Sequence, residues 1–226
     1  NILITAMNQT SQFVKLNQQS TDKFVLEFNT EPISISFDKT SHKKIIYTKT
    51  EATIRYATNK WDSKFIKCGL VNQLTIIDVD FCDTEACKKL LPLLFIATHI
   101  FVKTKKGYHF YFYYDARLKS RTGGTLGYDI LNDDTNVITP NSSYLDENDE
   151  LFTYELFVHQ DCEIDGLVEM SDELITLIND FENIPKVKKP TRKGFIKDHL
   201  TAAGERTVTI NELVKELGDK GIHVRA

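Results

Sequence analysis

The chain has 226 residues, of which 41% are hydrophobic and 27% charged, and its 28 Lys and Arg against 32 Asp and Glu give a formal net charge of −4. This length and composition, with 14 Phe and 9 Tyr, predict a folded chain with a sizeable core and exclude an intrinsically disordered one. The sequence shows no targeting peptide and no apolar run long enough to cross a bilayer, so we expect an intracellular, reducing location (cytoplasm or nucleus) and no membrane partner.

Residues 1–60 contain short runs in which apolar and polar residues alternate. Examples are "KFVLEF", "ISISF" and "KKIIY", separated by Asn, Asp, Ser and Thr. This pattern predicts short strands and hairpins. No motif in this part of the chain indicates its role.

The middle of the chain reads as a β-α-β-β-β sequence. A strand at "LTIIDVDF" precedes a helix over 83–95, with Asp83 as its N-cap and Pro92 limiting its length. The runs "ATHIFVKT" and "YHFYFYYD" predict a hairpin through "KKG", and short strands at "YDIL" and "NVITP" follow a Gly-rich loop. We therefore expect an α+β fold with helices packed on one face of a mainly antiparallel sheet.

The last part of the chain contains a helix and a basic linker. "SDELITLINDFENI" predicts an amphipathic helix led by Ser171, and "PKVKKPTRKG" follows it. Residues 195–226 contain a second helical pattern, with Thr209 and Glu212 at capping-box spacing. We place a domain boundary near residue 186, between a domain over 1–185 and a basic linker with a helical segment over 186–226.

Two acids interrupt the apolar strand at 74–81. Since side chains alternate across a strand, Asp78 and Asp80 lie on one face, roughly 6.5 to 7 Å apart. Such a pair can share a divalent cation, which would neutralise the repulsion between the two carboxylates. The alternative is that both acids lie at an exposed strand end.

His109 begins the second strand of the predicted hairpin. With Lys105 and Lys106 beside it, the imidazole could donate a hydrogen bond to a phosphate, and Gly107 would allow a close backbone approach. The alternative is a structural histidine beside core aromatic residues.

Asp129 is a single acid in the strand "YDIL", directly after the Gly-rich loop. A third carboxylate beside Asp78 and Asp80 would complete a ligand set for two Mg²⁺ or Mn²⁺ ions, an arrangement that supports phosphoryl or nucleotidyl transfer. An acid that caps a turn is the simpler interpretation. The order of the motifs on separate strands of one predicted sheet favours the joint site.

Basic residues cluster twice, which bears on phosphate binding more than the net charge does. Six Lys or Arg lie between Lys103 and Arg121 with Asp115 as the single acid, and six more lie between Lys186 and Lys197 with none. Arg121 and its neighbours are candidates for phosphate contact, or form a solvated loop. The four cysteines lack C-x-x-C spacing, so we expect free thiols rather than a structural zinc site.

Three segments resemble the motifs of the archaeo-eukaryotic primase superfamily, in particular the primase-polymerase domains of plasmid, phage and large DNA virus replication proteins. They are "TIIDVD", "KKGYHFYF" and "GYDIL…NVITPNSSY", within residues 68–145. The family pattern is D-x-D or D-x-E, then S-x-H or G-x-H, then an acid on an apolar strand. "ITPNSSY" lacks the second proline of the family's V-x-x-P-P-S segment.

The resemblance implies roles for individual residues. Asp78, Asp80 and Asp129 would be catalytic carboxylates that bind two Mg²⁺ or Mn²⁺ ions, and His109 and Lys105 would contact the phosphates of the nucleotide.

The same resemblance adds Gly107 and Ser142 to the nucleotide-binding residues, and the basic cluster adds Arg121. It also implies an RRM-like, mainly antiparallel sheet with helices (about 71–185), paired with an N-terminal α/β module (about 1–70) and followed by a small helical C-terminal appendage.

The activity implied is DNA-templated nucleotidyl transfer, in which a DNA primase or polymerase makes or extends primers during replication. Its partners would be a single-stranded DNA template, (d)NTPs and a helicase domain or protein. Another metal-dependent nucleotide enzyme, such as a nuclease or a D-x-D nucleotidyl or glycosyl transferase, is an alternative. A catalytically inactive module that binds single-stranded nucleic acid is a second alternative, but three acids on one sheet face disfavour it. A purely structural protein is the third alternative.

Overall fold

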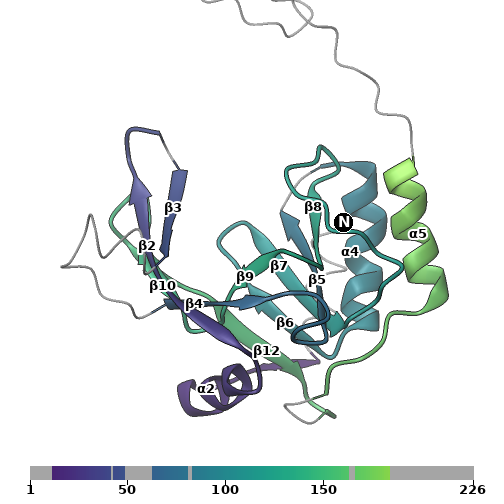
Figure 1. Cartoon of the computed structure of the whole chain (residues 1–226), viewed down its shortest axis with the longest axis horizontal. Coiled ribbons are helices and arrows are strands. Elements are labelled where there is room, and N and C mark those ends of the chain that lie inside the picture. Colours follow the sequence, from purple (N-terminus) through teal and green to yellow (C-terminus); the bar gives the residue numbers. More distant parts are fainter. Residues whose placement is uncertain (1–11, 42, 49–62, 81–82, 163–165, 184–226) are drawn as a thin grey trace, which may run out of the picture. The chain divides into compact units, whose positions relative to one another are not determined.

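The computed structural model describes residues 12–41, 43–48, 63–80, 83–162 and 166–183 (Figure 1). The chain divides into the units Asn1–Asn183 and Ile184–Ala226, and all described residues belong to the first. The described part is α+β, with three helices and antiparallel strand pairing throughout, as the sequence predicted. The basic linker and second helical pattern predicted over 186–226 lie outside the described residues.

A six-stranded sheet forms the centre of the described unit. Its strand order is β1 (Phe13–Lys15), β12 (Glu155–His159), β6 (Ile100–Lys103), β7 (Gly107–Tyr113), β5 (Leu74–Asp80) and β8 (Tyr128–Leu131). The predicted hairpin is confirmed, because β6 pairs with β7 and the Thr104 N–H donates to the Gly107 carbonyl at 2.9 Å.

A second sheet contains four strands in the order β3 (Lys43–Thr48), β2 (Thr30–Asp38), β4 (Ser63–Lys67) and β9 (Asn136–Ile138). The strands predicted at "ISISF", "KKIIY" and "NVITP" are therefore confirmed. β9 follows β8 closely in the chain but joins β4, so the segment after Asp129 leads from one sheet to the other. A separate hairpin consists of β10 (Ser143–Leu145) and β11 (Leu151–Thr153).

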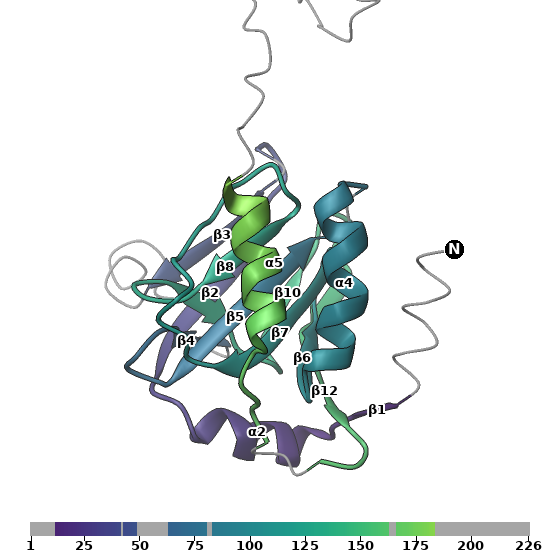
Figure 2. The same cartoon turned by 90° about the vertical axis from the view of Figure 1, so that its right-hand side faces the viewer.

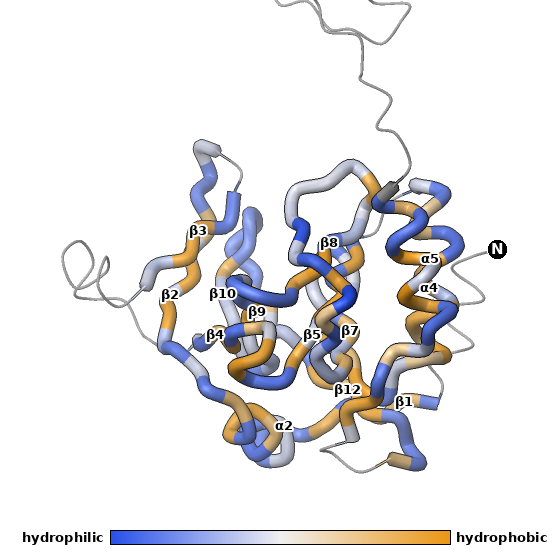
Figure 3. Tube along the Cα trace, turned by 45° about the vertical axis from the view of Figure 1, so that its right-hand side comes forward, coloured by the Kyte–Doolittle hydropathy of each residue, from blue (hydrophilic) through white to orange (hydrophobic). Residues whose placement is uncertain are grey.

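Two helices cover one face of the six-stranded sheet: α4 (Glu85–Ala97) and α5 (Asp172–Asn183). They lie side by side against that face in Figure 2, and the hydrophobic segments of these helices and of the strands stand out in Figure 3. Ser171 caps α5 as predicted, since its Oγ accepts the Leu174 N–H at 3.2 Å. The core between helices and sheet includes Ile77, Val79, Phe110, Phe112, Tyr128 and Ile130 from the strands, and Leu90, Leu94, Ile175 and Ile178 from the helices.

Two details of α4 differ from the prediction. Thr84, not Asp83, is the N-cap, and its Oγ accepts the Cys87 N–H at 3.1 Å. Pro92 lies inside the helix and does not end it, because Leu91, Leu94 and Phe95 around it are buried in the core and offset the lost backbone hydrogen bond.

The run "KFVLEF" was predicted as a strand, and this is wrong. Its first four residues end helix α2 (Gln18–Leu26), which begins after Asn17, whose side chain accepts the Ser20 N–H at 2.9 Å. Thr21, Phe24 and Val25 are buried at helical spacing, which outweighs the local alternation. α2 and the four-stranded sheet form a second core against the other face of the six-stranded sheet.

Two further predictions concern residues that the structure describes. Cys68 and Cys162 are free thiols, as predicted, whereas Cys82 lies outside the described residues. In the part of the chain that the structure describes, each helix is too short or too polar to cross a membrane.

Candidate functional site

Three of the predicted site residues form one row across three adjacent strands. On β5, Asp78 pairs in register with His109 of β7 on one side and with Asp129 of β8 on the other. Residues directly opposite each other in an antiparallel pair project to the same face, with Cβ atoms about 4.5 to 5.5 Å apart. Asp80 follows two positions along β5, opposite Gly107.

This row lies on the sheet face that α4 and α5 do not cover. Ile77 and Val79 belong to the core beneath those helices, so the alternation of β5 directs Asp78 and Asp80 to the opposite face. Burial also decreases along the strand, from fully buried residues at its start to a half-buried Asp78 and an exposed Asp80 at its end. The two acids are thus accommodated where the strand leaves the core.

The carboxylates are electrostatically strained. Burial raises the pKa of Asp78 to about 7, the facing Asp129 adds to the increase, and Lys44 opposes it. Burial and the charge of Asp78 likewise raise the pKa of Asp80. A group that adds positive charge here would relieve this strain.

His109 is buried and neutral. Burial, together with Lys44, lowers its pKa to about 3, so its approach to Asp78, at 3.6 Å between Nε2 and Oδ1, is not an ion pair at neutral pH. The ring stacks on Tyr154 with centroids 5.9 Å apart. Among the described residues, Nδ1 of His109 has no hydrogen-bond partner.

Lys44 of β3 is a site residue that the sequence analysis missed. Although the residue as a whole is exposed, its ammonium group donates a hydrogen bond to the Tyr154 hydroxyl at 2.6 Å. Burial of that group lowers the pKa of Lys44, and Asp78 and Asp80 oppose the decrease. Only the alternation of "KKIIY" was available as a signal, and it does not say which strands of the other sheet the side chain will approach.

Lys105, predicted to contact phosphates, is held by acids. Its Nζ lies 2.6 Å from Asp146 Oδ2 and 2.5 Å from Glu147 Oε2, both in the turn between β10 and β11. These hydrogen bonds raise the pKa of Lys105. Its charge is therefore neutralised within the described chain.

Gly107 and Ser142 both lie in close contact with other strands and loops of the fold. A Cβ at Gly107 would lie 1.7 Å from the Val79 carbonyl oxygen, so the close approach that needs this glycine is that of β7 to β5. Ser142 is buried, and its Oγ lies 2.9 Å from Thr139 Oγ1 and accepts the Lys64 N–H at 3.3 Å.

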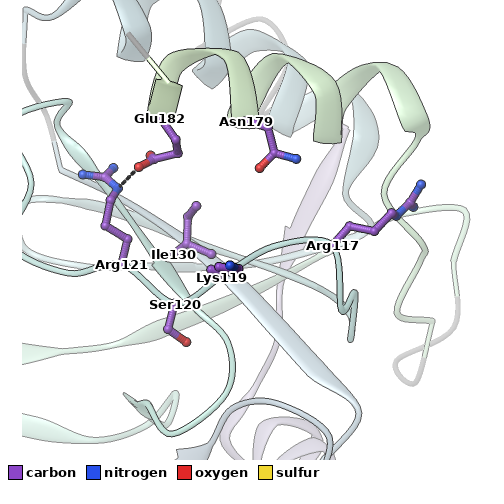
Figure 4. A pocket seen from close by; sticks show the side chains of 7 residues that line it. All are labelled: Arg117, Lys119, Ser120, Arg121, Ile130, Asn179 and Glu182. Carbon is purple, nitrogen blue, oxygen red and sulfur yellow. Dashed lines mark ion pairs between the residues drawn. The ribbon is translucent and has the colours of Figure 1, made fainter. Parts of the chain in front are cut away.

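Arg121 lies on the other side of the sheet, beneath α5. It forms an ion pair with Glu182 at 2.6 Å and donates to the Tyr128 carbonyl at 2.7 Å. Figure 4 shows this pair at one end of a pocket that Ile130 also lines. The volume of the pocket is about 410 Å³. The structure thus brings Asp78, Asp80, His109 and Asp129 together, with Gly107 beside them, and separates Arg121 from this row.

The donor set suits a hard divalent cation, although the described residues contain no group of three or more His, Cys, Asp or Glu side chains already arranged to hold one. Mg²⁺ and Mn²⁺ prefer carboxylate oxygens, which Asp78 and Asp129 supply from facing positions and Asp80 from the next position on the same face. The raised pKa of Asp78 means that a proton competes with a cation for this carboxylate near neutral pH. The residues present therefore fit the metal that the family resemblance implies.

Neither a scan against protein-family models nor a search of curated proteins found a match. The resemblance to primase-polymerase domains therefore depends on the three motifs and on where the fold places them.

Proposed function

We propose that this chain is a DNA primase or polymerase that makes or extends primers by metal-dependent nucleotidyl transfer, with single-stranded DNA as template and (d)NTPs as substrates. One observation carries the proposal: Asp129, Asp78 and His109 occupy a single row across β8, β5 and β7, with Asp80 beside them. Three motifs that are separated in the sequence converge on the face opposite α4 and α5.

The strand order supports an RRM-like module. The elements β5, α4, β6, β7 and β8 follow one another in the chain, and the strands lie in the order β6-β7-β5-β8 with antiparallel neighbours. These four strands of the six-stranded sheet have the order and the first helix expected of the β-α-β-β-α-β pattern, of which the RRM is one form, whereas no helix of the described chain lies between β7 and β8. Strands β2, β3 and β4 would belong to the N-terminal module.

Asp78, Asp80 and Asp129 would hold the cations. Two Mg²⁺ or Mn²⁺ ions bound there would lower the pKa of the attacking 3′-hydroxyl and stabilise the leaving pyrophosphate. Since burial raises the pKa of Asp78 to about 7, cation binding near neutral pH would displace the proton from the protonated fraction of this side chain.

His109 would bind the triphosphate as a neutral group. Its lowered pKa leaves one ring nitrogen as a hydrogen-bond donor and the other as an acceptor. A neutral donor next to Asp78 can approach a phosphate oxygen without forming a competing ion pair with the carboxylate. The stacked Tyr154 ring would keep the imidazole plane fixed.

The test is incubation of the purified chain with single-stranded DNA, Mn²⁺ or Mg²⁺ and labelled nucleotides, with and without a primer. We expect Asp78→Asn and Asp129→Asn to reduce product at least about 100-fold, because each removes a proposed metal ligand. Asp134→Asn is the matched control, since Asp134 lies in an exposed turn just after β8, with a φ of 59° that Asn adopts readily.

Equal product from Asp78→Asn and the unaltered chain would refute the proposed site. Product that does not depend on the template, or cleavage of the DNA, would point instead to another metal-dependent nucleotide enzyme.

A further inference from the structure

Lys44 reaches the acidic row from a different sheet. It lies on β3, which pairs only with β2 among the described strands, whereas Asp78 lies on the six-stranded sheet. The Lys44 Nζ donates to the Tyr154 hydroxyl at 2.6 Å and lies 5.3 Å from the centroid of the same ring. The Tyr154 ring in turn stacks on His109, and His109 Nε2 is 3.6 Å from Asp78.

We propose that Lys44 is a nucleotide-binding residue whose ammonium group contacts the phosphates of the incoming triphosphate, opposite the carboxylates across the site. This inference rests on the proposed function and extends it, because it assigns part of the substrate site to the four-stranded sheet. Tyr154 is then a positioning residue, which holds the ammonium group on one side and the imidazole on the other.

The charge of Lys44 is available for a ligand. No described carboxylate lies within ion-pair distance of its Nζ, and its hydrogen-bond partner is a neutral hydroxyl. Lys105, the basic residue that the motif predicted for phosphates, is instead bound by Asp146 and Glu147. A lysine ammonium group is a compact, mobile point charge of the kind that binds phosphate oxygens.

The aromatic surroundings suit this role. Nζ of Lys44 also lies 5.8 Å from the Tyr144 ring centroid, so two ring faces hold the cation without cancelling its charge. Lys44 as a whole is exposed, so its ammonium group can leave the Tyr154 hydroxyl for a stronger anionic acceptor without unpacking a core.

The experiment measures binding to the full chain by calorimetry, separately for Mn²⁺ alone, for a dNTP with Mn²⁺, and for inorganic tripolyphosphate with Mn²⁺. We expect Lys44→Met to weaken dNTP and tripolyphosphate binding about 10- to 100-fold, as loss of a charge-assisted hydrogen bond does. Mn²⁺ alone should bind to Lys44→Met at least as tightly as to the unaltered chain, because a nearby positive charge has been removed.

Lys43→Met is the matched control. It makes the same change of charge at the neighbouring position of β3, where alternation directs the side chain to the other face. Lys44→Arg, which keeps the charge, should lose less affinity than Lys44→Met. Tyr154→Phe, which removes only the hydroxyl, should weaken dNTP binding by less than Lys44→Met does.

The outcomes separate the two proposals. If the unaltered chain binds dNTP with Mn²⁺ but Lys44→Met binds it equally well, the role of Lys44 is refuted and the proposed function stands. If Lys44→Met weakens Mn²⁺ and dNTP alike, Lys44 only maintains the shape of the site, and the inference fails. If the unaltered chain binds neither Mn²⁺ nor dNTP, the proposed function itself fails.

Discussion

Asp78 and Asp129 lie directly opposite each other on β5 and β8, so two carboxyl groups occupy one cross-strand position. Like charges in such a position destabilise a sheet, and their repulsion contributes to the raised pKa of Asp78. The pair therefore lowers the stability of the metal-free fold, as expected where a sheet face is arranged for a ligand and not for its own packing.

The effect of Asp78→Asn on stability should depend on pH. Since folding raises the pKa of this carboxyl from 3.8 to about 7, the folded state binds more protons than the unfolded state between these values. The contribution of Asp78 to the free energy of unfolding thus decreases as pH rises from 4 to 7. Because 29% of the side chain is exposed, solvent limits the change to about 2 kcal/mol.

The measurement compares urea unfolding of the unaltered chain and Asp78→Asn in EDTA at pH 4.5 and pH 8. The contribution of His109 to stability has the opposite pH dependence, because folding lowers its pKa to about 3. The free energy of unfolding of one protein therefore mixes both effects, whereas the difference between the two proteins isolates that of Asp78. Asp78→Asn should gain about 2 kcal/mol relative to the unaltered chain between the two pH values. An equal difference in stability at both pH values would contradict the raised pKa of Asp78.

Mn²⁺ should stabilise the folded chain. A ligand that binds only the folded state adds about 2.7 kcal/mol to the free energy of unfolding at 100 times its dissociation constant. Asp78→Asn should remove most of this gain and Asp134→Asn should retain it. The gain should also be smaller at pH 6 than at pH 8, because Asp78 must lose a proton first. Thermal unfolding with Mn²⁺ and with EDTA checks this, and identical midpoints would contradict metal binding at the row.

The shared face of the acidic row was predictable because it depends on local patterns. Alternation in "TIIDVD" and "YDIL" places Asp78 and Asp129 on the face away from the apolar residues, and in "YHFYFYY" it does the same for His109. One face of the sheet had to be buried by the helices, which fixes the register of the strands.

Residues placed by long-range contacts were harder to predict. Lys44 joins the site only because the four-stranded sheet packs on the six-stranded one, which no local pattern reports. Arg121 was grouped with the nucleotide-binding residues by its basic neighbours, but a charge cluster in sequence does not say on which side of a sheet a loop will lie. "KFVLEF" shows the same limit, since burial at helical spacing decides its structure.

Gly107 should resist substitution for steric reasons. Because a Cβ would lie 1.7 Å from the Val79 carbonyl oxygen, Gly107→Ala and Gly107→Ser must push β7 away from β5 and should cost about 3 kcal/mol. Gly123→Ala is the comparison, as no atom lies within 4 Å of its Cβ position and the cost of about 1 kcal/mol comes from its φ of 69°. Urea unfolding checks both, and a larger loss at Gly123 would contradict the crowding at Gly107.

Arg121→Met separates a structural from a nucleotide-binding role for this arginine. Breaking its 2.6 Å ion pair leaves Glu182 of α5 without its cation, at a site where 15% of the Arg121 side chain and 21% of the Glu182 side chain are exposed. We expect a loss of about 2 kcal/mol in the free energy of unfolding, below that of a fully buried pair, and dNTP affinity within about twofold of the unaltered chain.

The double variant Arg121→Met, Glu182→Leu should recover part of the lost stability, because the unpaired carboxylate is gone. Urea unfolding and calorimetric titration with dNTP and Mn²⁺ measure the two properties independently. A tenfold loss of dNTP affinity at normal stability would assign Arg121 to the nucleotide site after all. It would also require the substrate to reach the α5 side of the sheet, where Arg121 and Glu182 now hold the helix against β8.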